Sequence, residues 1–141
     1  MTKNFTLAEL TKTSVKADNT PTAQHIASLQ ALCENVLQPA RDALGPLKIN
    51  SGYRSAKVNA AVGGSSTSQH SKGEAADLNY SGGNDVLYHW LVENVEFDQI
   101  IWEFGTDKAP AWVHVSYAKG KNRKQKLKAV KVNGKTKYLP L

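Results

Sequence analysis

Apolar residues recur at helical spacing along the first third of the chain. Between Thr20-Pro21 and Gly45-Pro46 they form one face of a predicted helix, with proline near its start and glycine at its end. We expect Pro39 to kink this helix, because proline lacks the amide hydrogen that the helical ladder needs. Further helices are predicted from Thr6 onward and over residues 55–62 and 84–94.

Short apolar or alternating runs, bounded by turn residues, predict strands in the rest of the chain. Their ranges are 47–50, 75–80, 97–104 and 112–117. A hairpin is predicted within residues 130–138, because Asn133-Gly134 separates two alternating segments. Helices come first and strands follow, with one helix inserted. The expected fold is therefore a single α+β domain whose helices pack on a small antiparallel sheet.

Charge divides the chain into an acidic body and a basic tail. The net charge is +6, yet residues 1–118 hold nine basic residues against all 12 acidic ones, and the other nine basic residues lie within 119–137. We divide the chain into a body, 1–118, and a basic C-terminal extension, 119–141, that is part of the same domain or appended to it. Such a tail either binds a polyanion or protects a sheet edge with lysines.

The composition excludes several classes of protein. A single cysteine, Cys33, excludes a disulfide framework and a cysteine-rich zinc cluster, and its place on an apolar helix face predicts a core residue. No apolar run approaches the length of a membrane span, and the first ten residues lack a signal-peptide pattern. We therefore expect synthesis in the cytoplasm without a signal peptide.

Three side chains are candidate ligands of a metal ion. His70 lies in a Gly/Ser-rich loop, Asp77 in the following strand and His114 in the middle of an apolar strand. Two imidazoles and one carboxylate would leave the fourth tetrahedral position open, the arrangement of a catalytic rather than a structural zinc site. Taken alone, a strand histidine is more often a hydrogen-bonded polar residue, whereas a buried aspartate needs a partner.

Three short sequence motifs contain or accompany these candidates: Ser51-Gly52-Tyr53-Arg54, the stretch from Ser68-Gln69-His70 to Ala76-Asp77, and Trp112-Val113-His114. In this order and spacing they resemble the zinc D-alanyl-D-alanine carboxypeptidase family, which includes the L-alanyl-D-glutamate peptidase endolysins of phages. The resemblance covers roughly residues 5–117 and not the basic tail. It implies the hedgehog/DD-peptidase fold.

The resemblance implies one zinc ion per chain, held by His70, Asp77 and His114. It gives Arg54 the task of holding a substrate carboxylate or a developing oxyanion, for which a planar, always charged guanidinium is suited. The alternative for Arg54 is an ion pair that braces a loop. Ser68 matches a residue beside the metal that contacts substrate or only caps the loop.

The general base is the point where the sequence departs from this family. Many relatives carry an acidic residue three positions before the last histidine, where this chain has Ala111. If the last two body strands pair about residues 108 and 109, Glu103 lies directly opposite His114 and becomes the candidate base. Otherwise Glu103 orients a histidine or is a plain cross-strand charge. Asp107 and Glu74 are weaker candidates.

Two aromatic residues of these strands have different expected places. Trp112 shares a face with His114 and is expected to wall the substrate cleft, whereas Trp102 alternates away from Glu103 and is expected in the core.

The function implied by the resemblance is zinc-dependent hydrolysis of an amide bond in bacterial peptidoglycan peptides, of the D-Ala-D-Ala carboxypeptidase or L-Ala-D-Glu endopeptidase type. We expect a monomer that acts on the cell wall after release or as part of a virion, and whose tail contacts an anionic wall polymer or membrane surface. The alternative is a non-catalytic zinc-binding module of the same fold. Nucleic-acid binding is disfavoured, because the tail has one aromatic residue, Tyr138.

Overall fold

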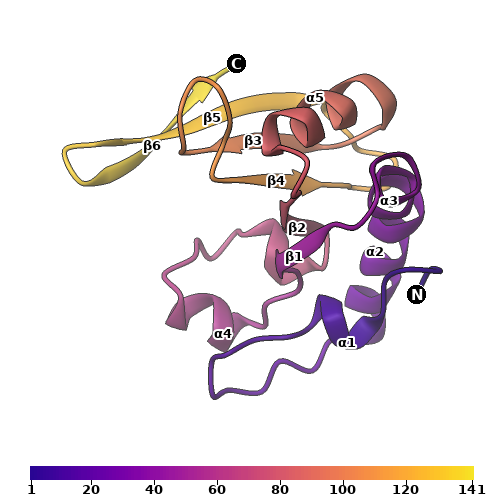
Figure 1. Cartoon of the computed structure of the whole chain (residues 1–141). Helices are drawn as coiled ribbons and strands as arrows, with labels where there is room; N and C mark the ends of the chain where they lie inside the picture. Colours follow the sequence, from indigo (N-terminus) through magenta and orange to yellow (C-terminus); the bar gives the residue numbers. More distant parts are fainter.

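The computed structural model describes residues 1–141 and has the α+β architecture that the sequence predicts (Figure 1). The helical segments are α1 (Leu7–Leu10), α2 (Ala23–Leu32), the π-helical turn η1 (Cys33–Leu37), α3 (Gln38–Leu44), α4 (Ala56–Ala61), the 3₁₀ turn η2 (Gln69–Lys72) and α5 (Asn84–Asn94). The strands are β1 (Lys48–Ser51), β2 (Ala75–Asn79), β3 (Gln99–Glu103), β4 (Trp112–Ser116), β5 (Gln125–Val132) and β6 (Lys135–Pro140).

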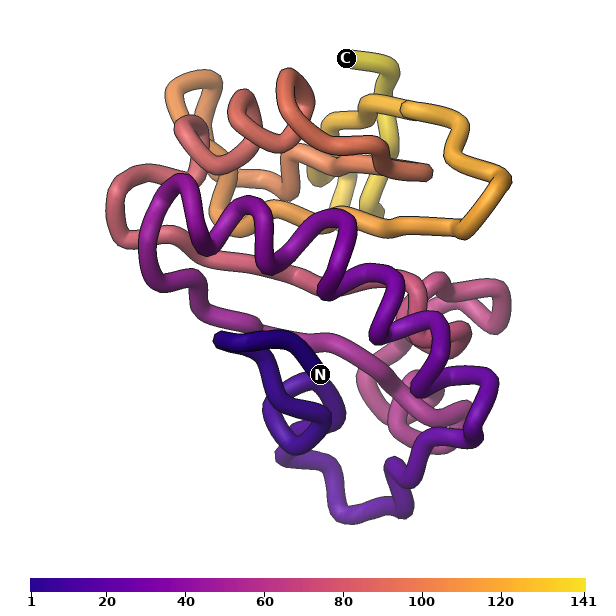
Figure 2. The backbone as a smooth tube through the Cα atoms, turned by 90° about the vertical axis from the view of Figure 1, so that its right-hand side faces the viewer, coloured from indigo at the N-terminus to yellow at the C-terminus, as the bar shows by residue number.

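The first long helix is continuous through α2, η1 and α3, and in Figure 2 it runs along β1 and β2. It begins after Thr22, whose hydroxyl accepts a hydrogen bond from the His25 amide, and not at Thr20-Pro21. Just before Pro39 the ladder widens into the π-helical turn, in which the Gln38 amide donates to the carbonyl of Cys33. None of the helices has the length and apolar character that a bilayer crossing requires.

The six strands form one sheet in the order β1-β2-β4-β3-β5-β6. Four neighbouring pairs are antiparallel, as expected, and the pair β3–β5 is parallel, which the sequence did not predict. The parallel pair arises because the chain leaves β4, passes the start of β3 and returns on its far side. There the amides of Lys124 and Gln125 donate to the carbonyls of Phe97 and Asp98.

The two faces of the sheet have different environments. On one face Leu78, Val113 and Ile100 are fully buried against α2, α3 and α5. This face forms the hydrophobic core, and Trp102 lies in it as predicted. Because successive side chains of a strand alternate, Asp77 and its neighbours on the adjacent strands point to the other face. The core therefore fixes the strands, and the opposite face is left for polar side chains.

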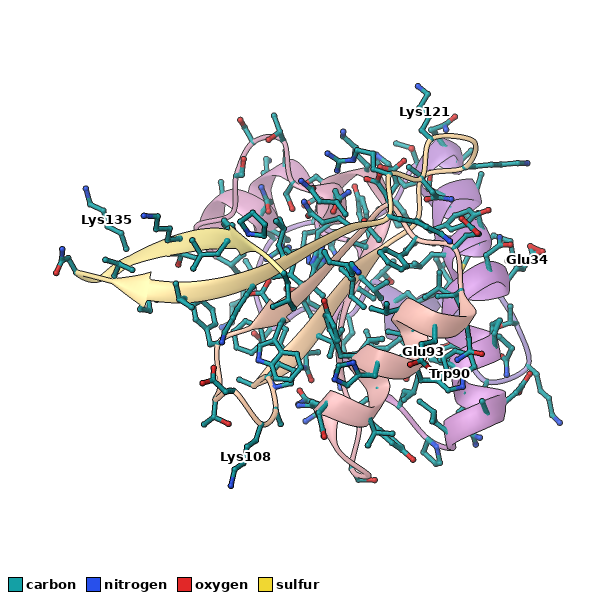
Figure 3. All side chains as sticks on the ribbon, turned by 90° about the horizontal axis from the view of Figure 1, so that it is seen from above. Glu34, Trp90, Glu93, Lys108, Lys121 and Lys135 are labelled. Carbon is teal, nitrogen blue, oxygen red and sulfur yellow. The ribbon has the colours of Figure 1, made fainter.

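The basic tail is part of the sheet. It contains the predicted hairpin, whose turn residues Asn133 and Gly134 have φ angles of 52° and 77°, as a type I′ turn requires. The hairpin is longer than predicted and projects beyond the body, with Lys135 near its tip (Figure 3). At its base, Ala129 pairs with Glu103 and is fully buried. The tail thus supplies two of the six strands of the sheet.

This pairing predicts that the tail is needed for folding. Removing residues 119–141 exposes the edge of β3 and the fully buried Ala129 contact, and should lower the melting temperature by at least about 10 °C in a thermal unfolding measurement. A chain that lacks only residues 133–141 keeps the β3–β5 ladder and should lose much less. An unchanged melting temperature of the 1–118 chain would show that the tail is an independent appendage.

Candidate metal centre and substrate cleft

His70, Asp77 and His114 come together on the polar face of the sheet. Asp77 in β2 pairs directly with His114 in β4, and His70 reaches the same point from η2. One potential ligand atom from each residue lies within 4.8 Å of the others. The Oδ1 atom of Asp77 is 3.3 Å from Nε2 of His70 and 3.1 Å from Nδ1 of His114. The structure thus brings the three candidates into one cluster.

The backbone around His70 fixes its ring. Nδ1 of His70 donates to the carbonyl of Gly52 at 2.8 Å, which leaves the lone pair of Nε2 directed at the cluster. Gly52 has no room for a side chain, because a Cβ atom there would lie 2.3 Å from the carbonyl oxygen of Leu10. Gly73 ends η2 with a φ angle of 73° and lets the chain turn from His70 into β2. These glycines therefore let the loop place the histidine.

The donor set fits a zinc ion. Burial alone would raise the pKa of Asp77, but its close contacts with the His114 and His70 rings outweigh burial and hold this pKa below its ordinary value. Asp77 is therefore a carboxylate, and His70 keeps a nitrogen lone pair for a metal. Two imidazole nitrogens and one carboxylate oxygen are typical of a catalytic zinc site with one open position.

Glu103 lies on the same face, but not in the predicted register. It pairs with Trp112, and Ile101 pairs with His114, so the hairpin is shifted by two residues from the expected alignment. The connection between the two strands holds a turn at Gly105, and the Ala111 amide donates to the Glu103 carbonyl at 2.9 Å. A shift of two residues keeps Glu103 on the side of His114, as its diagonal neighbour.

The environment of Glu103 suits a proton acceptor. Its side chain is buried, and burial raises its pKa to about 7, with His114 lowering the pKa and Asp77 raising it. A carboxyl group with a pKa near neutrality both takes up and releases a proton at neutral pH. Of the weaker candidates, Asp107 is exposed, pairs with Lys128 at 2.7 Å and lies beside Trp102 on the core side of the sheet. Glu74 lines the cleft but lies outside the three-ligand cluster.

Arg54 lines the cleft without an acidic partner. No carboxylate forms an ion pair with its guanidinium, so the structure does not support a loop-bracing role. Its Nε atom is buried and has no hydrogen-bond partner. Burial lowers the pKa of Arg54, and the charge of Asp77 opposes this change. A half-buried cation with unmet donors is a ready site for an anionic group of a ligand.

A cleft of about 1110 Å³ passes over these residues. Ser68 lines it and also caps η2, because its hydroxyl accepts a hydrogen bond from the His70 amide at 3.2 Å. Trp112 also lines the cleft, and its ring lies 5.4 Å from the ring of Phe104. Lys131 and Tyr138 of the tail hairpin extend the same wall.

Sequence reasoning missed several of these neighbours. Gln69 stands next to a proposed ligand, and its amide contacts both His114 and Asp98. Arg123, read only as one charge of the basic tail, forms a bidentate pair with Asp98. Tyr138 was counted only as a lone aromatic residue. Only Gln69 had a sequence signal, its place beside His70.

Comparison with known proteins places the chain in a family. The model of the family described as Peptidase M15 matches residues 3–116, which is most of the chain. The chain belongs to the peptidase M15 family. It is also similar to the zinc D-Ala-D-Ala carboxypeptidase of Streptomyces albus G, with 40% identity over 78 residues that make up 53% of this chain. The match covers 31% of that relative, so this M15 chain corresponds to less than a third of its length.

The ligand cluster predicts the metal content of this M15 protein. The purified protein should hold about one zinc ion per chain, and His70→Ala and Asp77→Ala should each lose it, because two donors rarely hold zinc tightly. Metal analysis and the rise in melting temperature on adding zinc to the metal-free protein measure this. His89→Ala, in an exposed position on α5, is the control and should keep the metal. Full zinc in Asp77→Ala would contradict the assignment.

Proposed function

We propose that the chain is a zinc-dependent peptidase that hydrolyses an amide bond in bacterial peptidoglycan peptides. The observation that carries the proposal is the convergence of three metal donors with buried Glu103 and unpaired Arg54 in one open cleft. Membership of the M15 family supports the peptidase chemistry. The name of the Streptomyces albus G relative, a zinc D-Ala-D-Ala carboxypeptidase, supports zinc as the metal and a peptidoglycan peptide as the substrate class.

Each cleft residue has one task in the proposed reaction. Zinc, when bound, supplies Lewis acidity toward the scissile carbonyl and toward the attacking water. The Glu103 carboxylate accepts a proton from that water and returns it to the nitrogen of the leaving amine. The Arg54 guanidinium holds the oxyanion or a terminal carboxylate of the peptide. His70, Asp77 and His114 hold the metal, and Trp112 packs against the peptide.

Two bond specificities fit this site. A D-Ala-D-Ala carboxypeptidase needs a cation for the terminal carboxylate, and Arg54 provides one. An L-Ala-D-Glu endopeptidase needs a cleft that continues on both sides of the metal donors. The lining of the cleft of about 1110 Å³ includes both Lys121 and Tyr138, and a cleft of this size has room for such a substrate.

The alternative is a non-catalytic zinc-binding module of the same fold. Ala111 favours it, because this position cannot take a proton, and in the structure Ala111 is exposed at the end of the loop. Glu103 favours the enzyme, because a buried carboxyl group without an ion pair is costly to keep without a use.

The tail contributes a basic surface besides its structural role. Strand pairing puts four tail lysines on the face opposite the cleft: Lys126, Lys128, Lys135 and Lys137. They suit contact with an anionic wall polymer or membrane surface while the cleft holds a peptide. In this proposal the monomer acts on the wall after release from the cytoplasm or as part of a virion, in the manner of a phage lysis enzyme.

Digestion of purified peptidoglycan tests the proposed function. The protein should release peptides in a zinc-dependent manner, and a chelator should abolish this release until zinc is restored. Mass spectrometry of the products separates the two specificities: loss of one D-alanine identifies a carboxypeptidase, and a new D-glutamate amino terminus identifies the endopeptidase. Bound zinc with neither of these two products would leave the non-catalytic zinc-binding module as the function.

Replacing Glu103 tests its role as the base. Glu103→Gln should keep zinc and fold and lose at least about 100-fold in turnover, because an amide of nearly the same shape cannot accept the proton. Turnover and zinc content should be measured on the same sample, and Asp107→Asn is the matched control on the opposite face. Near-normal turnover of Glu103→Gln would point to Glu74 instead.

A further inference from the structure

Two cations of the cleft, Arg54 and Lys131, have no acidic partner and lie on opposite sides of the metal donors. We propose that Lys131, assisted by Tyr138, forms a second subsite of the cleft, which binds a carboxylate on a substrate side chain two residues away from the scissile bond. This inference rests on the proposed function and narrows its substrate to peptides that carry such a carboxylate.

Strand pairing places Lys131 relative to the metal donors. His114 pairs with Ile101, and Ile101 pairs with Leu127, so the metal donors and Leu127 form one row across the sheet. Lys131 follows Leu127 by four residues on β5, which puts it on the same face and about 13 Å along the strand from this row. The row that contains Glu103 lies between the two. Lys131 therefore stands beyond the proposed base, on the far side from the metal donors.

Arg54 lies in the other direction from the metal donors. Ser51, the last residue of β1, pairs with Asp77. The chain then continues past this pair to Arg54, whose amide donates to the carbonyl of His70. Because β1 and β5 run in opposite directions, the chain moves from the metal row toward Arg54 on one side and toward Lys131 on the other. A peptide bound across the metal donors thus has one cation near each end.

The surroundings of Lys131 hold its ammonium group in place. Its Nζ atom lies 5.5 Å from the centre of the Phe104 ring and donates to Oγ1 of Thr136 at 3.0 Å. An ammonium group has three hydrogens, so donors remain for a ligand. An aromatic face and a hydroxyl oxygen carry no net charge. These contacts therefore position the charge of Lys131 without neutralising it.

The charge of Lys131 is unbalanced, in contrast to the charges of Lys72 and Lys121 in the same cleft. Burial raises the pKa of Glu74, and the charges of Lys72 and Lys121 oppose this rise, so these two lysines have an acidic neighbour. Lys131 forms no ion pair, and no acidic residue follows Asp107 in the sequence. The hairpin end of the cleft therefore attracts an anionic group of a substrate.

Tyr138 supplies a hydrogen-bond donor beside Lys131. It pairs with Ala129, which in turn pairs with Glu103, so these three residues form one row on the cleft face. Burial raises the pKa of Tyr138, and the charges of Glu103 and Asp77 raise it further, so the phenol keeps its hydrogen at neutral pH. The hydroxyl can thus donate to the same carboxylate that Lys131 attracts.

The spacing suits the third residue of a peptidoglycan peptide. In the sequence L-Ala-γ-D-Glu-X-D-Ala-D-Ala, residue X is the second residue from either candidate bond. Two extended residues span about 7 Å, and the long side chains of X and Lys131 bridge the remaining distance. When X is meso-diaminopimelate its side chain ends in a carboxylate as well as an ammonium group, whereas lysine has the ammonium group alone. We therefore expect a preference for the diaminopimelate peptide.

Binding of these two pentapeptides, which differ by one carboxylate, tests the subsite. Titration calorimetry uses the zinc-loaded Glu103→Gln protein, which the proposed mechanism leaves unable to cut them. The diaminopimelate peptide should bind about 3- to 5-fold more tightly, the usual scale of an exposed ion pair. The difference should shrink at high salt, because salt screens the attraction.

Variants of the same protein assign the preference to its residues. Lys131→Gln should abolish the difference between the two peptides, and Lys131→Arg should keep it, because arginine retains the charge. Tyr138→Phe should reduce it. Lys108→Gln is the matched control: it removes an equal charge from an exposed lysine that lies outside the cleft lining (Figure 3), and it should keep the full preference.

The outcomes separate the subsite from the proposed function. Equal binding of both peptides, a preference that persists in Lys131→Gln, or an equal loss in Lys108→Gln would overturn the subsite and leave the proposed function intact. Binding of neither peptide would overturn both. The expected preference, together with an unmodified protein that cuts neither peptide, would refute the proposed function alone, because the binding measurement does not depend on turnover.

Discussion

Two central strands, β2 and β4, pair along four residues each, and this pairing places Asp77 directly beside His114. On an antiparallel ladder, directly paired side chains lie on the same face about 5 Å apart, which is close enough for both to bind one ion. A shift by one residue would send one of the two into the core. The next pair along the ladder, Leu78 and Val113, is apolar, and both residues are fully buried. The hydrophobic core therefore holds the register on which the metal centre depends.

The same register concentrates ionisable groups on one face of the sheet, and burying these groups lowers the stability of the fold. Asp77, Glu103 and Asp98 are all largely removed from water, and only Asp98 has an arginine partner. Burial raises the pKa of Glu103 to about 7, above its ordinary value, so the stability that its protonated form provides is lost as the pH rises toward 7. A bound dication would favour the charged form and offset this loss. The buried acidic groups of the cleft thus lower the folding stability, as the groups of functional sites commonly do.

The tail shows how one segment serves several purposes. Alternation along β5 and β6 directs Lys131 and Tyr138 to the cleft and Lys126, Lys135 and Lys137 to the opposite face. At the start of the segment, Arg123 holds Asp98 beside the residues that surround the metal donors. Deleting such a segment changes packing, cleft shape and surface charge together. Single substitutions are therefore needed to separate these effects.

The sequence by itself determined the elements, the α+β class and the three candidate ligands. Patterns within short segments sufficed for this, because helical spacing, the Asn133-Gly134 turn and the motif that contains His70 and Asp77 are each properties of a short segment. The tertiary structure decided what depends on distant segments: the two-residue shift that sets Glu103 beside Trp112, the parallel pairing of β5 with β3, and the contact of Gln69 with both Asp98 and His114. The geometry of a loop fixes the register of its hairpin, and long-range packing brings residues 69, 98, 114 and 123 together. Neither the register nor this grouping can be read from any one stretch of residues.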